Sequence, residues 1–139
     1  LKETGWTFGS HTWGHIRLDS RPLESVQRDT VRWAEEVGSL VGPTNILFYP
    51  HGGRPDGDDW HSTGPVFQYL QSQGFRIFAS VGINSFSYIK KDISAVICDR
   101  LHPDGTTLRN GKALEWYSQF YDAREIIDLD VRPDLGVTW

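Results

Sequence analysis

The sequence predicts an α/β fold, because short apolar runs alternate along the chain with amphipathic segments. Between Leu23 and Leu40 the apolar residues recur at steps of three and four, as in a helix with one buried face. The runs at 45–50 and 75–81 are short, apolar and bounded by turn residues, as in buried strands. Alternation of this kind favours parallel strands joined by right-handed helical crossovers.

The individual elements follow in order along the chain. A first strand ends within 6–11, and Ser20 and Pro22 suit the cap and first turn of the helix predicted at 23–40. Gly42, followed by a proline, ends that helix. The remaining predicted elements are a strand at 45–50, a helix at 66–73, strands at 75–81 and 93–98, a helix at 112–121 and a last strand at 125–130.

Composition limits the classes of protein to which the chain can belong. Its 139 residues suffice for one domain with a core, and no repeat or linker divides them, so we predict a single domain over 1–139. No apolar run approaches the roughly 20 residues that span a bilayer. The net charge of −4 argues against a nucleic-acid partner, which calls for a basic surface. The lone Cys98 leaves the redox compartment open.

A pair of histidines is the first feature that could carry chemistry. His11 and His15 lie four residues apart in GSHTWGH, directly after the strand predicted at 6–11. Imidazoles at this spacing can bind one metal ion together, and neutral imidazole is a good zinc ligand. A catalytic zinc usually has three protein ligands, so one ligand is missing from the local motif. The alternative is a pair of partly buried or surface histidines that bind no metal.

The order of elements around this pair resembles that of the polysaccharide deacetylase family, the NodB-homology domain of carbohydrate esterase family four. GSHTWGHIRL resembles the family's second motif, in which both histidines bind the catalytic zinc. The resemblance implies that His11 and His15 are metal ligands and that Thr12 supports the loop that presents them.

A second stretch, FYPHGG, resembles the family's third motif, Arg-x-Pro-Tyr-Gly. It places Pro50 at the proline, His51 at the aromatic position and Gly52 at the glycine, whereas Phe48 stands in place of the arginine. The resemblance implies that the backbone N–H of His51 helps to hold the oxyanion. It also implies the loss of the arginine that orients the catalytic carboxylate. A plain connection from strand to loop is the alternative.

The family's first motif, Thr-Phe-Asp-Asp, supplies the general base and completes the zinc site, but it has no counterpart before His11. The resemblance therefore implies a partial, deformed (β/α) barrel that lacks its first strands. The chain would be the carboxy-terminal part of the domain, inactive alone, with the missing amino-terminal part as its partner. The family's general acid lies in a Leu-x-His motif, for which His102 is the candidate here. The alternative is that His102 is only an exposed histidine in a turn.

Aromatic residues near these motifs could bind sugar. Trp13, Tyr49 and Trp60 are taken as exposed rings that could stack on sugars, although each could equally pack in the core. Together with Pro50 and Gly52 they form the predicted substrate-binding set.

The loop RPDGDDW, which follows FYPHGG, contains three aspartates. Asp56, Asp58 or Asp59 could supply a carboxylate to the cleft, or the three could form only a solvated acidic loop.

These features predict a metal-dependent hydrolase, most simply a zinc enzyme, that removes N- or O-acetyl groups from a polysaccharide or peptidoglycan-type polymer. Such a substrate would place the protein in the cell envelope or outside a bacterial cell. The rival hypothesis is a catalytically inactive module that binds carbohydrate or has a regulatory role on the same fold. An α/β-hydrolase is disfavoured, because the chain contains no Gly-x-Ser-x-Gly motif.

Overall fold

The computed structural model describes residues 1–57, 63–81, 88–90, 94–100, 115 and 117–119. The chain divides into two compact units, Leu1–His102 and Pro103–Trp139, and every helix and strand named below belongs to the first. In the second unit the Ser118 hydroxyl donates a hydrogen bond of 2.7 Å to the carbonyl oxygen of Glu115. The predicted helix at 112–121 lies largely outside the described residues, and the predicted strand at 125–130 lies wholly outside them.

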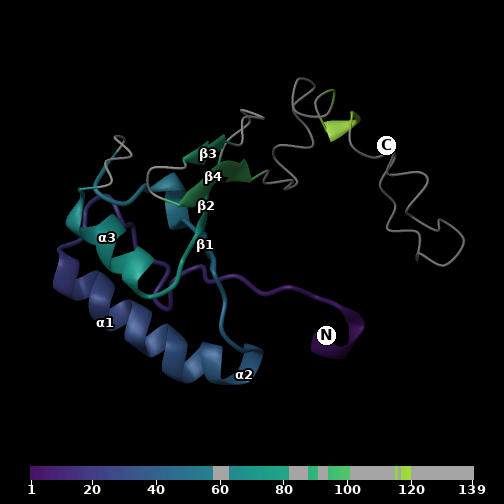
Figure 1. Ribbon diagram of the computed structural model, residues 1–139, viewed down its shortest axis with the longest axis horizontal. Helices are drawn as coiled ribbons and strands as arrows, with labels where there is room; N and C mark the ends of the chain where they lie inside the picture. Colours follow the sequence, from purple (N-terminus) through teal and green to yellow (C-terminus); the bar gives the residue numbers. More distant parts are fainter. Residues whose placement is uncertain (58–62, 82–87, 91–93, 101–114, 116, 120–139) are drawn as a thin grey trace, which may run out of the picture. The chain divides into compact units, whose positions relative to one another are not determined.

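A four-stranded sheet organises the first unit (Figure 1), with the order β1-β2-β4-β3. The strands are β1 (Ile46–Phe48), β2 (Ile77–Val81), β3 (Tyr88–Lys90) and β4 (Ala95–Arg100). β1, β2 and β4 are parallel, whereas β3 pairs antiparallel with β4. The three parallel strands confirm the strands predicted at 45–50, 75–81 and 93–98, and β3 was not predicted.

The segment before the histidine pair joins this sheet at a single point. Ser10 forms an isolated parallel bridge with Leu47 of β1. The Ser10 N–H donates to the carbonyl of Ile46 at 2.9 Å, and the Phe48 N–H donates to the carbonyl of Ser10 at 2.8 Å. The strand predicted at 6–11 is therefore present as one bridging residue, and that residue fixes the segment beside β1.

The helices lie on one side of the sheet (Figure 1), and α3 connects β1 to β2. They are α1 (Leu23–Trp33), which continues through a π-helical stretch (Ala34–Gly38) into α2 (Ser39–Val41), and α3 (Pro65–Ser72). Short 3-10 turns occur at Lys2–Thr4 and Pro50–Gly52. The helices predicted at 23–40 and 66–73 are confirmed. Among the described residues no helix has the length and apolarity needed to cross a bilayer.

The start of α1 differs from the prediction. The N-cap residue is Pro22, with extended backbone, and no side chain caps the helix, so Ser20 does not have the expected role. The N–H of Ser25 instead donates to the carbonyl oxygen of Pro22 at 2.9 Å. The φ of proline, fixed at about −65°, suits the start of a helix.

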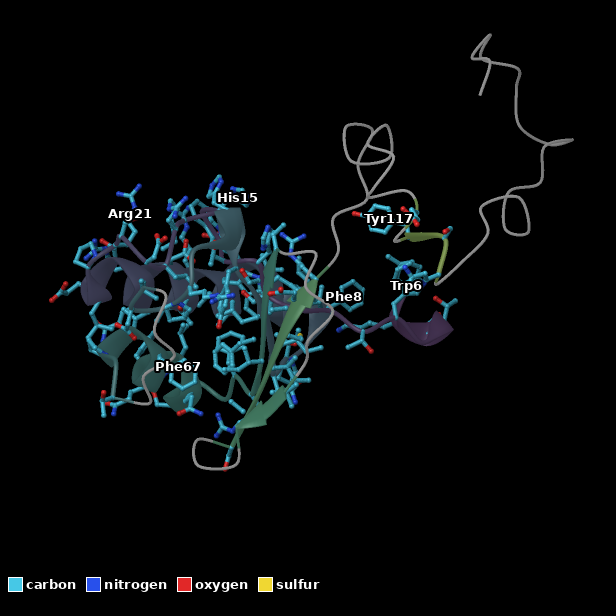
Figure 2. The ribbon with its side chains drawn as sticks, turned by 90° about the horizontal axis from the view of Figure 1, so that it is seen from above. Trp6, Phe8, His15, Arg21, Phe67 and Tyr117 are labelled. Carbon is cyan, nitrogen blue, oxygen red and sulfur yellow. The ribbon has the colours of Figure 1, made fainter. Side chains whose placement is uncertain are left out.

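The hydrophobic core lies between the sheet and the helices. Its buried members are Leu18, Val26, Leu47, Tyr49, Val66, Phe67, Leu70, Phe75, Phe78, Ala95 and Ile97. Leu47 pairs with Phe78 and Phe78 with Ile97, so alternate residues of neighbouring strands face the helices. The rings of Phe67 (labelled in Figure 2) and Phe78 have centroids 4.8 Å apart. This packing holds the carboxyl ends of the strands, from which the candidate site arises.

Candidate functional site

The histidine pair lies at the carboxyl ends of the parallel strands. Ser10 is bridged to Leu47, so His11 leaves the sheet beside the end of β1, and His51 lies in the turn that directly follows the same strand. Figure 2 shows His15 at the edge of the unit, and its side chain is exposed. Parallel α/β sheets build their sites at this end, because the loops that leave the strands converge there.

Three imidazoles meet at this point instead of two. The ring centroids of His11 and His15 are 4.9 Å apart, with the ring planes inclined by 75°. Those of His15 and His51 are 4.5 Å apart, with an inclination of 72°. His15 therefore lies in edge contact with both of the others. We call His11, His15 and His51 the histidine cluster.

A hydrogen bond fixes the orientation of the His11 ring. Its Nδ1 lies 2.8 Å from the carbonyl oxygen of Phe48. A carbonyl can only accept, so Nδ1 carries the proton. Burial lowers the pKa of His11 below its ordinary 6.5, the bond to Phe48 opposes this, and the charge of Arg100 and the other two imidazoles lower the pKa further. The neutral ring then directs the lone pair of Nε2 outward, which is the tautomer of a metal ligand.

An aspartate of α1 holds the loop that carries the pair. Asp29 is only 9 % exposed, and its carboxylate accepts the backbone N–H of Trp13 at 2.9 Å and that of Gly14 at 2.7 Å. Hydrogen bonds to an ionised acceptor are the stronger class. A Cβ on Gly14 would come within 3.1 Å of this carboxylate, so the glycine allows the close approach. The loop is thus fastened to the helix midway between His11 and His15.

Shorter-range hydrogen bonds complete the loop. The Thr12 hydroxyl accepts the N–H of Ile16 at 3.1 Å, and the N–H of Thr12 donates to the Ser10 hydroxyl at 3.2 Å. This is the support that the sequence predicted for Thr12. Thr12 and His15 both have left-handed backbone, with φ of 61° and 51°. The hydrogen bonds thus hold a conformation that L-residues seldom adopt.

The second loop is also held in a left-handed conformation. His51 has φ of 55° and Gly52 has φ of 68°, directly after the buried Pro50. The N–H of Gly53 donates to the carbonyl of Pro50 at 3.0 Å, and the Ser80 hydroxyl donates to the carbonyl of Gly52 at 3.3 Å. These bonds turn the chain so that the imidazole of His51 meets that of His15.

Tyr49 corrects one expectation of the sequence. Its side chain is 0 % exposed and lies in the core, with its ring centroid 6.2 Å from that of Phe78. Side chains alternate across a strand, so Tyr49 faces the helices together with Leu47, two residues before it. No ring face is left on which a sugar could stack. Pro50 is buried as well, so neither side chain offers a surface to a polymer in this structure.

Trp13 is exposed, as predicted, but its indole lies against α1. The Nε1–H donates to Glu36 at 2.8 Å, and the Arg32 guanidinium lies 3.5 Å from the ring centroid. Arg32 is itself bonded to Glu36 at 2.6 Å. A cation covers one ring face, which leaves at most the other face for a ligand.

Asp56 has a structural role at α3. Its two carboxylate oxygens accept the N–H groups of Val66 at 3.1 Å and Phe67 at 2.8 Å, which are first-turn donors of the helix. Both carboxylate oxygens of Asp56 are therefore engaged with α3, which favours its structural role. The other predicted residues Asp58, Asp59, Trp60 and His102 lie outside the described residues.

Two residues at the site were not predicted. Asp29 lies three residues after Val26 and four before Trp33, which are both buried. That spacing places it on the buried face, so the signal was present. Arg100 ends β4 and acts electrostatically on His11. Only the strand order brings it there, so the sequence carries no signal for it.

A hollow of about 560 Å³ lies elsewhere in the unit. Among its lining residues are Thr7, Phe8, Asn45 and Gly74, which lie at the amino ends of the strands. It is thus at the opposite end from the histidine cluster, and none of the chemistry described above involves it.

Comparison with family models, curated proteins and solved structures gave no match. The interpretation of the site therefore rests on its own residues. Within the described part of the chain, no group of three or more His, Cys, Asp or Glu side chains is already arranged to hold a metal ion. The donor set nevertheless suits one, because His11 has the tautomer and the carbonyl partner that metal-binding histidines commonly have.

Proposed function

We propose that the chain is part of a metal-dependent hydrolase that removes N- or O-acetyl groups from a polysaccharide or peptidoglycan-type polymer, on a partial (β/α) barrel. One observation carries the proposal. His11, oriented by the Phe48 carbonyl, lies in T-shaped contact with His15 at the carboxyl ends of parallel strands. The spacing alone is common, whereas the fixed tautomer and the place in the fold are what a metal ligand needs.

The reaction adds water across the bond between the acetyl carbon and the nitrogen or oxygen of the sugar, and releases acetate and the free amine or hydroxyl. A divalent metal, most simply zinc, would supply Lewis-acid polarisation of the carbonyl and a water that loses its proton near neutral pH. His11 and His15 would hold the metal through imidazole nitrogens. The backbone N–H of His51 supports the oxyanion, and His102 protonates the leaving group.

An alternative proposal is a module that binds the carbohydrate without hydrolysing it. One observation favours it: Phe48 stands where the deacetylase motif has an arginine, and its ring packs over Gly9, where a Cβ would come within 2.5 Å of it. The position is therefore occupied by an apolar contact in place of a charge.

Acetate release separates the two proposals. Because the chain is expected to be inactive alone, zinc-loaded protein that includes the amino-terminal part of the domain is incubated with acetylated chito-oligosaccharides and with peptidoglycan fragments, beside its His11→Asn variant and the control Ser94→Asn. Ser94 is exposed at the amino end of β4, far along the strand from the site. Release of acetate by the wild type and Ser94→Asn, lost in His11→Asn, supports the hydrolase. Retention of the sugars without any acetate release would favour the binding module.

A further inference from the structure

We propose that His51 is the third protein ligand of the metal, so that the histidine cluster forms a three-histidine centre. The inference rests on the proposed function in taking the cluster as a metal site. It adds a ligand that the motif around His11 and His15 does not contain, 36 residues beyond His15 in the chain. It also assigns to the side chain of His51 a role separate from that of its backbone N–H.

The spacing of the rings fits a shared ion. Two imidazoles that bind one tetrahedral zinc with Zn–N bonds of about 2.1 Å have ring centroids roughly 5 Å apart. The two contacts of His15 measure 4.9 Å to His11 and 4.5 Å to His51. Inclinations of 75° and 72° rule out face-to-face stacking, so neither pair of rings is held together by parallel faces.

The backbone provides a second, independent observation. His15 and His51 both have left-handed φ, of 51° and 55°, where a side chain with a Cβ costs about 1 kcal/mol relative to ordinary backbone. Two such residues whose rings meet each other indicate that the imidazoles themselves are needed at these positions. Strained residues of this kind gather at ligand-binding sites, where the surrounding structure holds them.

The side chains of His15 and His51 can also rotate to complete the set of metal ligands. Both side chains are exposed, whereas His11 is partly buried and bonded to Phe48. The described residues do not yet form a closed ligand set, so binding requires rotation of His15 and His51 toward the fixed ring of His11. Exposed side chains change rotamer on the nanosecond timescale, which makes this a small adjustment.

The test is zinc binding by calorimetry on the full chain after treatment with a chelator. The variants are His11→Asn, His15→Asn and His51→Asn, because asparagine accepts left-handed backbone and circular dichroism can confirm the fold. Ser94→Asn is the matched control, since it changes an exposed residue with φ of 49°. We expect one-to-one binding in the wild type and the control, and a loss of at least about 100-fold in each histidine variant.

A measurement on the wild type makes the result independent of the variants. X-ray absorption at the zinc edge counts the imidazoles bound to the ion, and three are expected. Two imidazoles, with unchanged affinity in His51→Asn, would overturn the role of His51 and leave the pair of His11 and His15. Absence of zinc binding by the wild type would overturn the centre altogether. Three imidazoles, without acetate release by the protein that includes the amino-terminal part of the domain, would support the centre and contradict the proposed hydrolase.

Discussion

Burial changes the pKa and the reactivity of individual side chains in this molecule, and Cys98 is an example. Burial raises the pKa of its thiol above the ordinary 9.0, and the charge of Asp99 adds to the rise. The sulfur lies 3.8 Å from the carbonyl oxygen of Phe78, within reach of a weak S–H hydrogen bond. Only the thiolate is nucleophilic, so Cys98 has little reactive form at neutral pH.

Cys98 should therefore react slowly with iodoacetamide. At pH 8 we expect the folded chain to be alkylated at least about tenfold more slowly than the same chain in urea, because the raised pKa moves thiolate formation to higher pH. The rate in the folded state should climb as pH increases past 9. Mass spectrometry of timed samples gives both rates, and equal rates at pH 8 would show that the thiol is not shielded.

The cap of α3 depends on a glycine. A Cβ on Gly64 would lie 2.1 Å from a carboxylate oxygen of Asp56, the group that accepts two first-turn N–H bonds. Asp56→Ala should lower the free energy of unfolding by about 1–2 kcal/mol through loss of the cap. Gly64→Ala should lower it by at least as much, since it displaces the same carboxylate.

The double variant of Gly64 and Asp56 supplies the control. With the carboxylate gone, a Cβ at 64 meets only the Cβ of residue 56, at 2.8 Å, so alanine at 64 should cost much less in the double variant than in the wild type. Urea denaturation of the four proteins measures the coupling. Additive losses would show that the two residues act separately.

At the scale of elements, periodicity predicts helices well and misplaces polar residues on them. The helix predicted at 23–40 is present, but Asp29 lies on its buried face and holds the histidine loop. A pattern that counts every aspartate as exposed cannot find this, because the partner N–H groups lie 15 and 16 residues away. The strand β3 was missed because Tyr88–Lys90 does not lie within a longer apolar run, as the equally short β1 does.

Asp29 is therefore a positioning residue for the loop of His11 and His15. In Asp29→Asn one of the two acceptor oxygens becomes an NH2 group that faces a backbone N–H. We expect a loss of about 1–3 kcal/mol in the free energy of unfolding and a roughly tenfold loss in zinc affinity. Glu35→Gln, on the exposed side of the same helical run, is the matched control. Unchanged zinc affinity in Asp29→Asn would show that the loop keeps its shape unaided.

At the scale of the molecule, the parallel sheet explains which part of the site the sequence could predict. His11 and His15 are close in the chain, so their spacing predicts them as a pair. His51 joins them only through the bridge between Ser10 and Leu47 and through a left-handed turn after β1. Strand register and left-handed backbone are properties of the folded chain, so local patterns in the sequence do not predict them.

The sheet also brings a cation toward the cluster. Arg100 ends β4, two strands away from β1 in the sheet, and its positive charge lowers the pKa of His11. A charge that disfavours a proton on His11 must also disfavour a metal dication bound there. Arg100→Gln should therefore raise zinc affinity, by about threefold to tenfold at low ionic strength, and the gain should shrink as salt is added.

Arg76→Gln is the control for this prediction, because Arg76 is an exposed arginine at the amino end of β2. Calorimetric titration of the three proteins at two salt concentrations measures the effect. If Arg100→Gln bound zinc more weakly than the wild type, the arginine would be orienting the site instead of opposing the ion. A gain confined to Arg100→Gln would show that the strand order of the sheet, and not the histidine motif alone, sets how strongly the centre holds its metal.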